Sequence, residues 1–124
     1  SCIIVDDDNN YIRVGSLVEC HTIPTIKHRA FSIIIYDKCD RMLLQQRSKT
    51  KYTFPLMWTN SICSHPRDLT KTTVDWIYFR LIDELGLKLE NLKERLTHIT
   101  DITYSAISDM KYGENEYDEI YTVL

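Results

Sequence analysis

The chain has 124 residues, enough for one compact domain and too few for two. Hydrophobic residues make up 44% and charged residues 27%, a balance that is typical of a folded globular protein and not of a disordered one. The formal net charge of -3 disfavours a broad nucleic-acid-binding surface, which is usually basic, and no apolar run approaches the roughly 20 residues of a membrane-spanning helix.

The first part of the chain is predicted to be rich in β-strands. Residues 2–5 form a short apolar run that ends in an Asp/Asn turn sequence, and residues 11–14 are suited to pair back with them. Residues 30–36 are rich in Ile and aromatic side chains, which predicts a central strand. A polar turn over 37–40 leads to a further predicted strand over 41–46. We expect these strands to form an antiparallel meander.

One segment, residues 72–85, has strong helical periodicity. Thr72 or Thr73 is suited to cap its start, and Gly86 stands where a left-handed residue ends a helix. Strands around one clear helix predict an α+β, or α/β, sandwich in a single domain.

The remainder of the chain is predicted to contain a short helix and two strands. The helix covers residues 89–95, and the strands cover 96–107 and 117–124. The last strand runs to the end of the sequence without a stop signal, and the sequence begins without Met, so we expect it to be a piece of a longer chain.

Histidines and a Glu-x-Glu pair supply groups that are able to bind a divalent metal ion. The histidines are His21, His28, His65 and His98. In a strand, Glu114 and Glu116 would place both carboxylates on one face, because side chains repeat every two residues. Adjacent carboxylates repel, and a cation between them stabilises the pair. The same spacing also fits a solvated acidic strand end, and each histidine alone fits a surface or core position.

Cys63 stands two residues before His65. A nearby cation would favour its reactive thiolate, whereas apolar burial would favour the neutral thiol. A small buried hydrophobe is an equal alternative for this cysteine. None of the four cysteines forms a C-x-x-C pair, and we expect all four to be reduced thiols in a cytosol-like compartment.

Three cations from separate segments are candidates for binding a diphosphate. Arg47 and Lys51 follow a predicted strand, and Arg80 lies on the predicted helix, one turn before Glu84. The alternatives are ordinary solvated charge for the first two and a plain i,i+4 ion pair for Arg80 and Glu84.

Read together, these segments resemble the type 1 isopentenyl-diphosphate isomerase family of the Nudix superfamily. The matching strings are CH (20–21), HRAFS (28–32), LLQQRS (43–48), FP (54–55), WTN (58–60), CSHP (63–66), DELG (83–86), Tyr104 and GENE (113–116). They occur in family order along nearly the whole chain. The resemblance implies a Nudix-type mixed sheet sandwich over residues 1–124 with one main helix packed on it. Members of the family continue beyond the position of Leu124, so we expect this sequence to lack the family's C-terminal segment, either by truncation or as a shortened member.

The resemblance also implies a metal site. One divalent ion, Mg2+ or Mn2+ with Zn2+ as a further option, would be held by His21, His28, His65, Glu114 and Glu116. Glu84, on the Nudix-type helix, would help to hold a second Mg2+ against the diphosphate of the substrate.

Roles in substrate binding and catalysis follow from the same resemblance. The phosphate oxygens would be bound by Arg47, Lys51 and Arg80. Cys63 and Glu116, on opposite faces of the substrate, would handle the two protons, and Tyr104 would assist on the Glu116 side. The implied activity interconverts isopentenyl and dimethylallyl diphosphate, and the implied partner is this small molecule, with no nucleic acid and no membrane. We expect a cytoplasmic monomer or weak homodimer, with a peroxisome or another organelle as an alternative.

Departures from the family pattern keep two other functions open. Many members carry Lys four residues before the first metal-binding histidine, where this chain has Leu17. A Nudix pyrophosphohydrolase needs R-E-U-x-E-E-x-G, but Phe79 and Arg80 occupy the Arg and first Glu positions. The alternatives are a catalytically inactive Nudix-type binding or assembly subunit, and a pyrophosphohydrolase that Arg80 disfavours.

Overall fold

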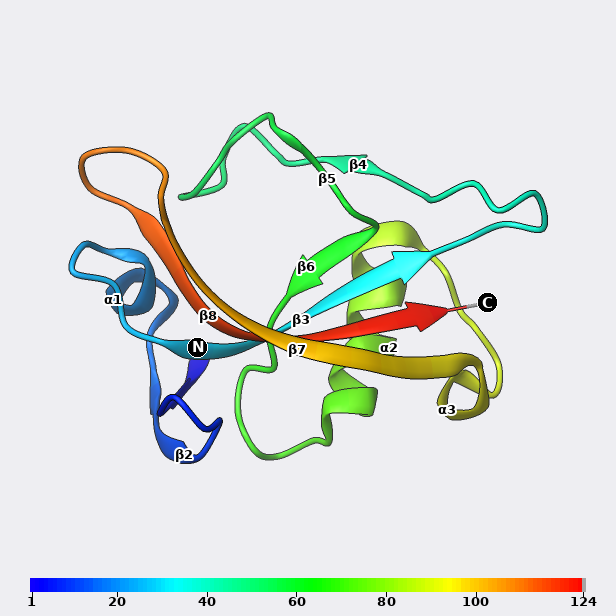
Figure 1. Cartoon of the computed structure of the whole chain (residues 1–124), viewed down its shortest axis with the longest axis horizontal. Helices are drawn as coiled ribbons and strands as arrows, with labels where there is room; N and C mark the ends of the chain where they lie inside the picture. The colour runs from blue at the N-terminus through cyan, green and yellow to red at the C-terminus, as the bar shows by residue number, and fades with distance from the viewer. Residues whose placement is uncertain (124) are drawn as a thin grey trace.

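A curved mixed sheet with one main helix packed against it forms the body of the chain, as Figure 1 shows for residues 1–123, which this computed structural model describes. The strand order is β2-β1-β3-β8-β7, and β6 also pairs with β3. The strands of the sheet are β1 (Cys2–Val5), β2 (Tyr11–Gly15), β3 (His28–Ile35), β6 (Ile62–Ser64), β7 (Leu96–Ile107) and β8 (Gly113–Val123). The helices are α1 (Leu17–His21), α2 (Thr73–Leu85) and α3 (Leu92–Arg95). This mixed α+β arrangement confirms the predicted fold class and is consistent with a Nudix-type fold.

The central strands β3 and β8 run parallel and divide their side chains between two faces. Phe31, Ile33 and Val123 point to the face that packs against α2, where Ile77 and Leu81 are fully buried. Because side chains alternate along a strand, the neighbouring positions, such as His28 and Glu116, lie on the opposite face. The hydrophobic core therefore occupies one face of these strands and leaves the other free for polar side chains.

Helix α2 is capped as the sequence predicts. The side chain of Thr72 accepts a hydrogen bond from the backbone N–H of Asp75. Gly86 ends the helix in the left-handed conformation, with φ 65°, and its N–H reaches back to the carbonyl of Ile82. The capped helix presents Arg80 and Glu84 toward the cavity described below.

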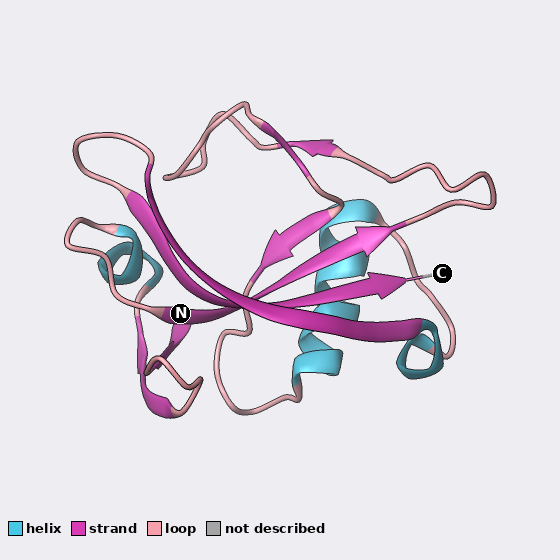
Figure 2. Cartoon of the chain, viewed as in Figure 1, coloured by secondary structure: helices cyan, strands magenta, loops and turns pink. Residues whose placement is uncertain are grey.

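Other predicted elements are confirmed in part. The hairpin of β1 and β2 and the strand at 96–107 form as predicted. The strand at 41–46 shrinks to β4 (Gln45–Gln46), which pairs with β5 (Trp58–Thr59) in a separate two-stranded sheet. The predicted meander is therefore wrong beyond β3, whose remaining partners are β6 and β8. Figure 2 shows the β4–β5 segment as mostly loop, arching over the sheet.

The boundaries of the late elements also shift. The short helix begins at Leu92 instead of residue 89, after Asn91 in a left-handed conformation. The last strand begins at Gly113, four residues earlier than predicted, because β7 continues its pairing to this point. Leu124, the last residue of the predicted strand, lies outside the described residues.

Candidate metal centre and active site

A row of three polar side chains crosses the sheet on the face opposite α2. Tyr104 of β7 pairs directly with Glu116 of β8, and Glu116 pairs with His28 of β3. The hydroxyl of Tyr104 donates a hydrogen bond of 2.5 Å to Oε2 of Glu116, and Nε2 of His28 lies 3.6 Å from Oε1 of the same carboxylate. The strand register alone thus brings together residues that are far apart in the sequence.

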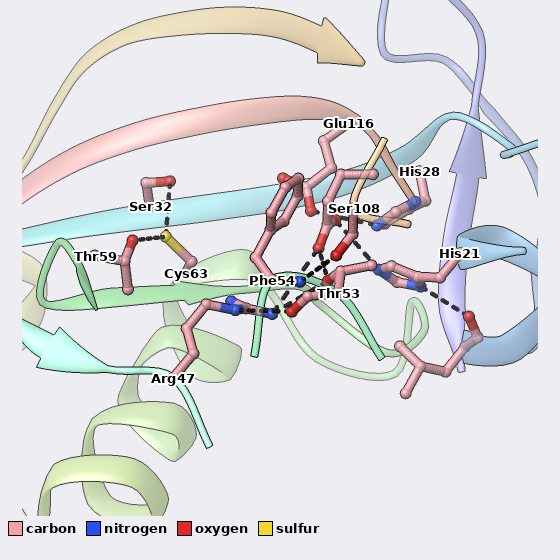
Figure 3. A network of polar contacts seen from close by, with 12 residues as sticks. His21, His28, Ser32, Arg47, Thr53, Phe54, Thr59, Cys63, Ser108 and Glu116 are labelled. Atoms are coloured by element: carbon pink, nitrogen blue, oxygen red, sulfur yellow. Dashed lines mark hydrogen bonds and ion pairs between the residues drawn. The ribbon is translucent and has the colours of Figure 1, made fainter. Parts of the chain in front are cut away.

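Helix α1 adds a second histidine to this row. His21, in its last turn, is buried and lies with Nε2 3.3 Å from Oε2 of Glu114, two residues before Glu116 on β8. The ligand atoms of His21, His28, Glu114 and Glu116 all lie within 4.8 Å of one another. Figure 3 shows the two imidazoles and Glu116 pointing toward one another.

Backbone carbonyls fix the orientation of both imidazoles. Nδ1 of His21 lies 2.8 Å from the carbonyl of Leu17, and Nδ1 of His28 lies 3.1 Å from the carbonyl of Ile26. A carbonyl only accepts, so each Nδ1 must carry the hydrogen, and each Nε2 can then present a lone pair to the carboxylates. This arrangement of a second group behind the ring is typical of metal-binding histidines.

The atoms at the centre of the group are buried. Nε2 of His28 is inaccessible to solvent and has no hydrogen-bond partner, and Oε2 of Glu114, equally inaccessible, faces Nε2 of His21 at 3.3 Å. Two lone pairs that face each other in a buried site are unfavourable unless a cation lies between them. Imidazole nitrogens and carboxylate oxygens together suit a divalent metal ion such as Mn2+ or Zn2+, and the residues present therefore fit the implied metal.

His65 lies beside the four-residue group, and its ligand atoms are outside the 4.8 Å set. Its ring stands edge-on to that of His28, with the ring centroids 6.0 Å apart. Burial, followed by the proximity of His28 and His21, lowers the pKa of His65 to about 3. His65 is therefore a neutral imidazole beside the group, as a metal ligand must be.

The carboxyl groups of Glu114 and Glu116 have pKa values that are shifted in opposite directions. Burial, followed by the neighbouring Glu114, raises the pKa of Glu116 well above its usual value. Burial also opposes ionisation of Glu114, but hydrogen bonds from His21, Glu116 and Thr53 outweigh it and lower the pKa of Glu114. Without a metal, Glu114 is thus the ionised partner and Glu116 is the carboxyl that holds a proton.

The same cavity contains Cys63, on β6. Its thiol lies 2.7 Å from the amide oxygen of Asn60, and the hydroxyls of Thr59 and Ser32 lie 3.5 and 3.9 Å from the sulfur. Burial raises the pKa of Cys63, so the neutral thiol is favoured at rest. Of the two states considered from the sequence, this is the one expected for a buried cysteine. The hydroxyl of Ser32 donates to Oδ2 of Asp118, 2.7 Å away, and the hydroxyl of Thr59 donates to the amide oxygen of Asn60, 2.9 Å away.

The cavity has a volume of about 690 Å3, and its lining includes Glu116, Tyr104 and Cys63. The three predicted phosphate-binding cations, Arg47, Lys51 and Arg80, also line it. Arg80 forms the predicted helical ion pair, with its guanidinium 3.2 Å from Glu84 and 2.9 Å from Asp83. The structure thus contains both features considered for Arg80, an i,i+4 pair and a position at the cavity.

Glu84 lies apart from the His/Glu group. It lines a smaller adjoining cavity of about 230 Å3, to which Arg47, Lys51 and Cys63 also contribute. Its Oε2 atom is buried and has no hydrogen-bond partner, while Oε1 pairs with Arg80. Glu84 therefore keeps one carboxylate oxygen available for a cation on the cationic side of the cavity.

No sequence motif pointed to Thr53, which links the cationic side of the cavity to the His/Glu group. Arg47 donates hydrogen bonds of 3.1 and 3.2 Å to the carbonyl and hydroxyl of Thr53, and that hydroxyl donates a short hydrogen bond to Oε1 of Glu114. Thr53 is almost fully buried. A threonine in a loop carries no periodicity or motif, so the link becomes visible only when the loop folds over β8.

Cys2 is a second residue to which the sequence assigned no place at the site. Its thiol is fully buried and lies within 4.8 Å of the ligand atoms of His21 and His28. The hydrogen bond to Cys20, followed by burial, raises the pKa of Cys2 above its usual range. The thiol is accordingly neutral and forms the apolar wall of the group together with Cys20.

Curated relatives of the chain share one name. An isopentenyl-diphosphate delta-isomerase of Schizosaccharomyces pombe is 38% identical over 96% of this chain, and one of Aspergillus fumigatus is 40% identical over 93%. Isopentenyl-diphosphate Delta-isomerase I of Clarkia breweri is 36% identical over 99%. All three are named as isomerases. No protein-family model matches the chain.

The chain spans about half the length of the curated relatives it matches, namely 59%, 47% and 48% of these three. Across residues 1–123, every helix is too short or too polar to cross a membrane.

Proposed function

We propose that this chain interconverts isopentenyl diphosphate and dimethylallyl diphosphate on a Nudix-type domain, as a type 1 isomerase. The observation that carries the proposal is that three members of the His/Glu group, together with Tyr104 and Cys63, line one cavity with three cations. The names of the relatives, at 36–40% identity over nearly the whole chain, support the same activity.

The metal would be held by His21, His28, Glu114 and Glu116, with His65 as the fifth ligand. This ion, Mg2+, Mn2+ or Zn2+, supplies positive charge that acidifies a proton at the Glu116 side of the cavity. The imidazoles of His28 and His65, whose pKa values are lowered chiefly by burial, and the ionised Glu114 are already in the protonation states that such a site requires. His21 and Glu116, whose pKa values are raised, must give up a proton when the metal binds.

Glu116 and Cys63 act as the acid–base pair. Moving the double bond requires one proton to be added to the terminal alkene carbon. Another proton is removed from the CH2 group that lies between the branched carbon and the CH2 bearing the diphosphate. On the Glu116 side of the cavity, Glu116 delivers a proton to the alkene, with the Tyr104 hydroxyl hydrogen-bonded to its carboxyl. Cys63 accepts the second proton after it has released its own to the solvent, because the thiol is neutral at rest and only the thiolate is a base.

The cationic side of the cavity binds the diphosphate. Arg47, Lys51 and Arg80 neutralise its oxygens, and the free carboxylate oxygen of Glu84 helps to hold a second Mg2+ against them. The alkene end of the substrate then points toward Glu116 and Cys63, where the partly apolar cavity excludes water from the cationic transition state.

The free state of all four cysteines leads us to infer a reducing compartment such as the cytoplasm. We also infer that residues 1–124 act as one domain on a small-molecule substrate.

Incubation of the purified chain with isopentenyl diphosphate and Mg2+ tests the proposal. We expect dimethylallyl diphosphate as the product and no released phosphate. Release of inorganic phosphate would instead identify a pyrophosphohydrolase, and an unchanged substrate would identify a non-catalytic protein. Exhaustive chelation is expected to stop turnover, and full activity without metal would contradict the role of the His/Glu group.

A further inference from the structure

The cations that border the cavity differ in how far their charge is already neutralised. Arg80 is paired with Asp83 and Glu84 at 2.9 and 3.2 Å. Arg47 donates to Thr53 and lies 4.0 Å from Glu114. A dianionic or trianionic diphosphate must therefore compete with protein carboxylates for these two guanidinium groups.

Arg67 also lines the cavity, and its charge is not neutralised in this way. Its guanidinium has no hydrogen bond or ion pair with any residue in the described range 1–123. Instead it lies over two aromatic rings, 5.2 Å from the ring centroid of Phe79 and 5.9 Å from that of Trp76. A guanidinium over an aromatic face is attracted to the ring and keeps its N–H donors free in the ring plane.

The rings that support Arg67 belong to α2, the helix that also carries Arg80. Trp76 is buried and its indole N–H is bonded to the carbonyl of Asp68, so it is a rigid support. Phe79 packs edge-on against Trp76 with the ring centroids 6.1 Å apart. Arg67 is thus held at the cavity by a fixed apolar surface, without a carboxylate that would have to be displaced.

We propose that Arg67 is a fourth cation of the diphosphate site and binds the phosphate oxygens of the substrate from the α2 side. This inference rests on the proposed function for the identity of the substrate, but the binding of a diphosphate group can be measured without turnover. The partner that Arg67 recognises is the diphosphate group itself, because its free N–H donors match phosphate oxygens in pairs.

Lys71 provides a matched control for this inference. Its ammonium lies over the same two rings, 4.8 Å from the centroid of Trp76 and 5.2 Å from that of Phe79. It does not line the cavity. Removing Lys71 therefore changes the net charge and the contacts of the rings as the removal of Arg67 does, but leaves the cavity lining intact.

The test is calorimetric titration of inorganic diphosphate, with Mg2+ present, into the wild-type chain and the variants Arg67→Ala, Arg67→Lys and Lys71→Ala. We expect Arg67→Ala to raise the dissociation constant about tenfold, as the loss of a charge-assisted contact does, and Arg67→Lys to restore part of it. Lys71→Ala should remain within about twofold of wild type. Thermal melting of each variant verifies that the fold persists, and Arg67→Glu, expected to bind more weakly still, repeats the test with a polar side chain.

An unchanged dissociation constant in Arg67→Ala, or an equal loss in Lys71→Ala, would overturn the inference, as would a wild-type chain that does not bind diphosphate. Failure of the proposed function has a different signature. In that case the wild-type chain binds diphosphate and loses affinity on Arg67→Ala, but does not convert isopentenyl diphosphate.

Discussion

Nε2 of His21 lies 3.3 Å from Oε2 of Glu114, and only 8% and 9% of the two side chains is exposed. Because the other ring nitrogen of His21 faces the carbonyl of Leu17, the contact with Glu114 requires a positive species between the two atoms. In the absence of metal this species is a proton, since the contact with Glu114 outweighs burial and raises the pKa of His21. Metal binding must displace that proton.

Loss of either partner should weaken metal binding. We expect Glu114→Gln and His21→Asn to raise the dissociation constant for Mn2+ at least tenfold, because each removes one ligand from a buried set. Titration followed by electron paramagnetic resonance of free Mn2+ measures this. His98→Asn is the control, because His98, Asp101 and Glu119 form a separate group on the opposite face of the sheet. A larger loss of Mn2+ affinity in His98→Asn than in the other two variants would place the metal at the His98 group and contradict the assigned site.

Metal affinity should also fall as the solution becomes more acidic. The pKa values of His21 and Glu116 are both raised, so both groups hold protons to a higher pH than usual, and these protons compete with the ion. The dissociation constant for Mn2+ is expected to rise on going from pH 8 to pH 6. Isothermal titration at several pH values measures the trend, and His21→Asn should flatten it. A constant affinity across this range would contradict the assigned protonation states.

Removal of either acid–base group should nearly abolish turnover while leaving the fold intact. We expect Cys63→Ala and Glu116→Gln each to lower kcat by about 10²–10⁴-fold, the range for loss of a general acid or base. Cys39→Ala is the matched control, because Cys39 is an exposed free cysteine outside the cavity. Near wild-type turnover in Cys63→Ala, with circular dichroism unchanged in all three variants, would refute the assignment of the thiol.

The hydroxyl of Tyr104 should contribute less than the acid–base groups. Tyr104→Phe removes the 2.5 Å hydrogen bond to Glu116, and we expect kcat to fall about 10–100-fold, because the hydroxyl stabilises the charged carboxylate that remains after Glu116 delivers its proton. Tyr117→Phe removes a comparable 3.0 Å hydrogen bond to Asp101 on the other face and should leave kcat unchanged. Steady-state kinetics measures kcat for both variants. An equal fall in kcat in Tyr104→Phe and Tyr117→Phe would contradict the role of Tyr104.

The elements that the sequence predicts well are those with local signals. Helix α2 has a capping Thr72, an apolar stripe and a terminal Gly86, and the structure follows all three. The β1–β2 hairpin follows from its turn residues in the same way. The strand at 41–46 forms only in part. Met42 makes an isolated bridge to Tyr36 and the N–H of Leu43 donates to the carbonyl of Ile35, but the side chains of Met42, Leu43 and Leu44 are exposed and have no core face to cover.

The site depends on long-range pairing, which periodicity does not encode. The Glu-x-Glu spacing predicts that Glu114 and Glu116 share a face, but the parallel register of β8 with β3 is what brings His28 to Glu116. Most of the residues named by the family resemblance line one cavity, whereas Glu84 lines the smaller adjoining cavity and His28 is fully buried. Thr53 and Arg67, which no motif marks, could be found only from the fold.

The most direct test of the account is conversion of isopentenyl diphosphate in D2O, with Mg2+ and the purified chain, followed by proton NMR. Proton addition from one side of the cavity and removal on the other predict that dimethylallyl diphosphate appears with deuterium in its newly formed methyl group. Substrate that stays unlabelled and unconverted while the protein holds metal and diphosphate would contradict the proposed isomerase.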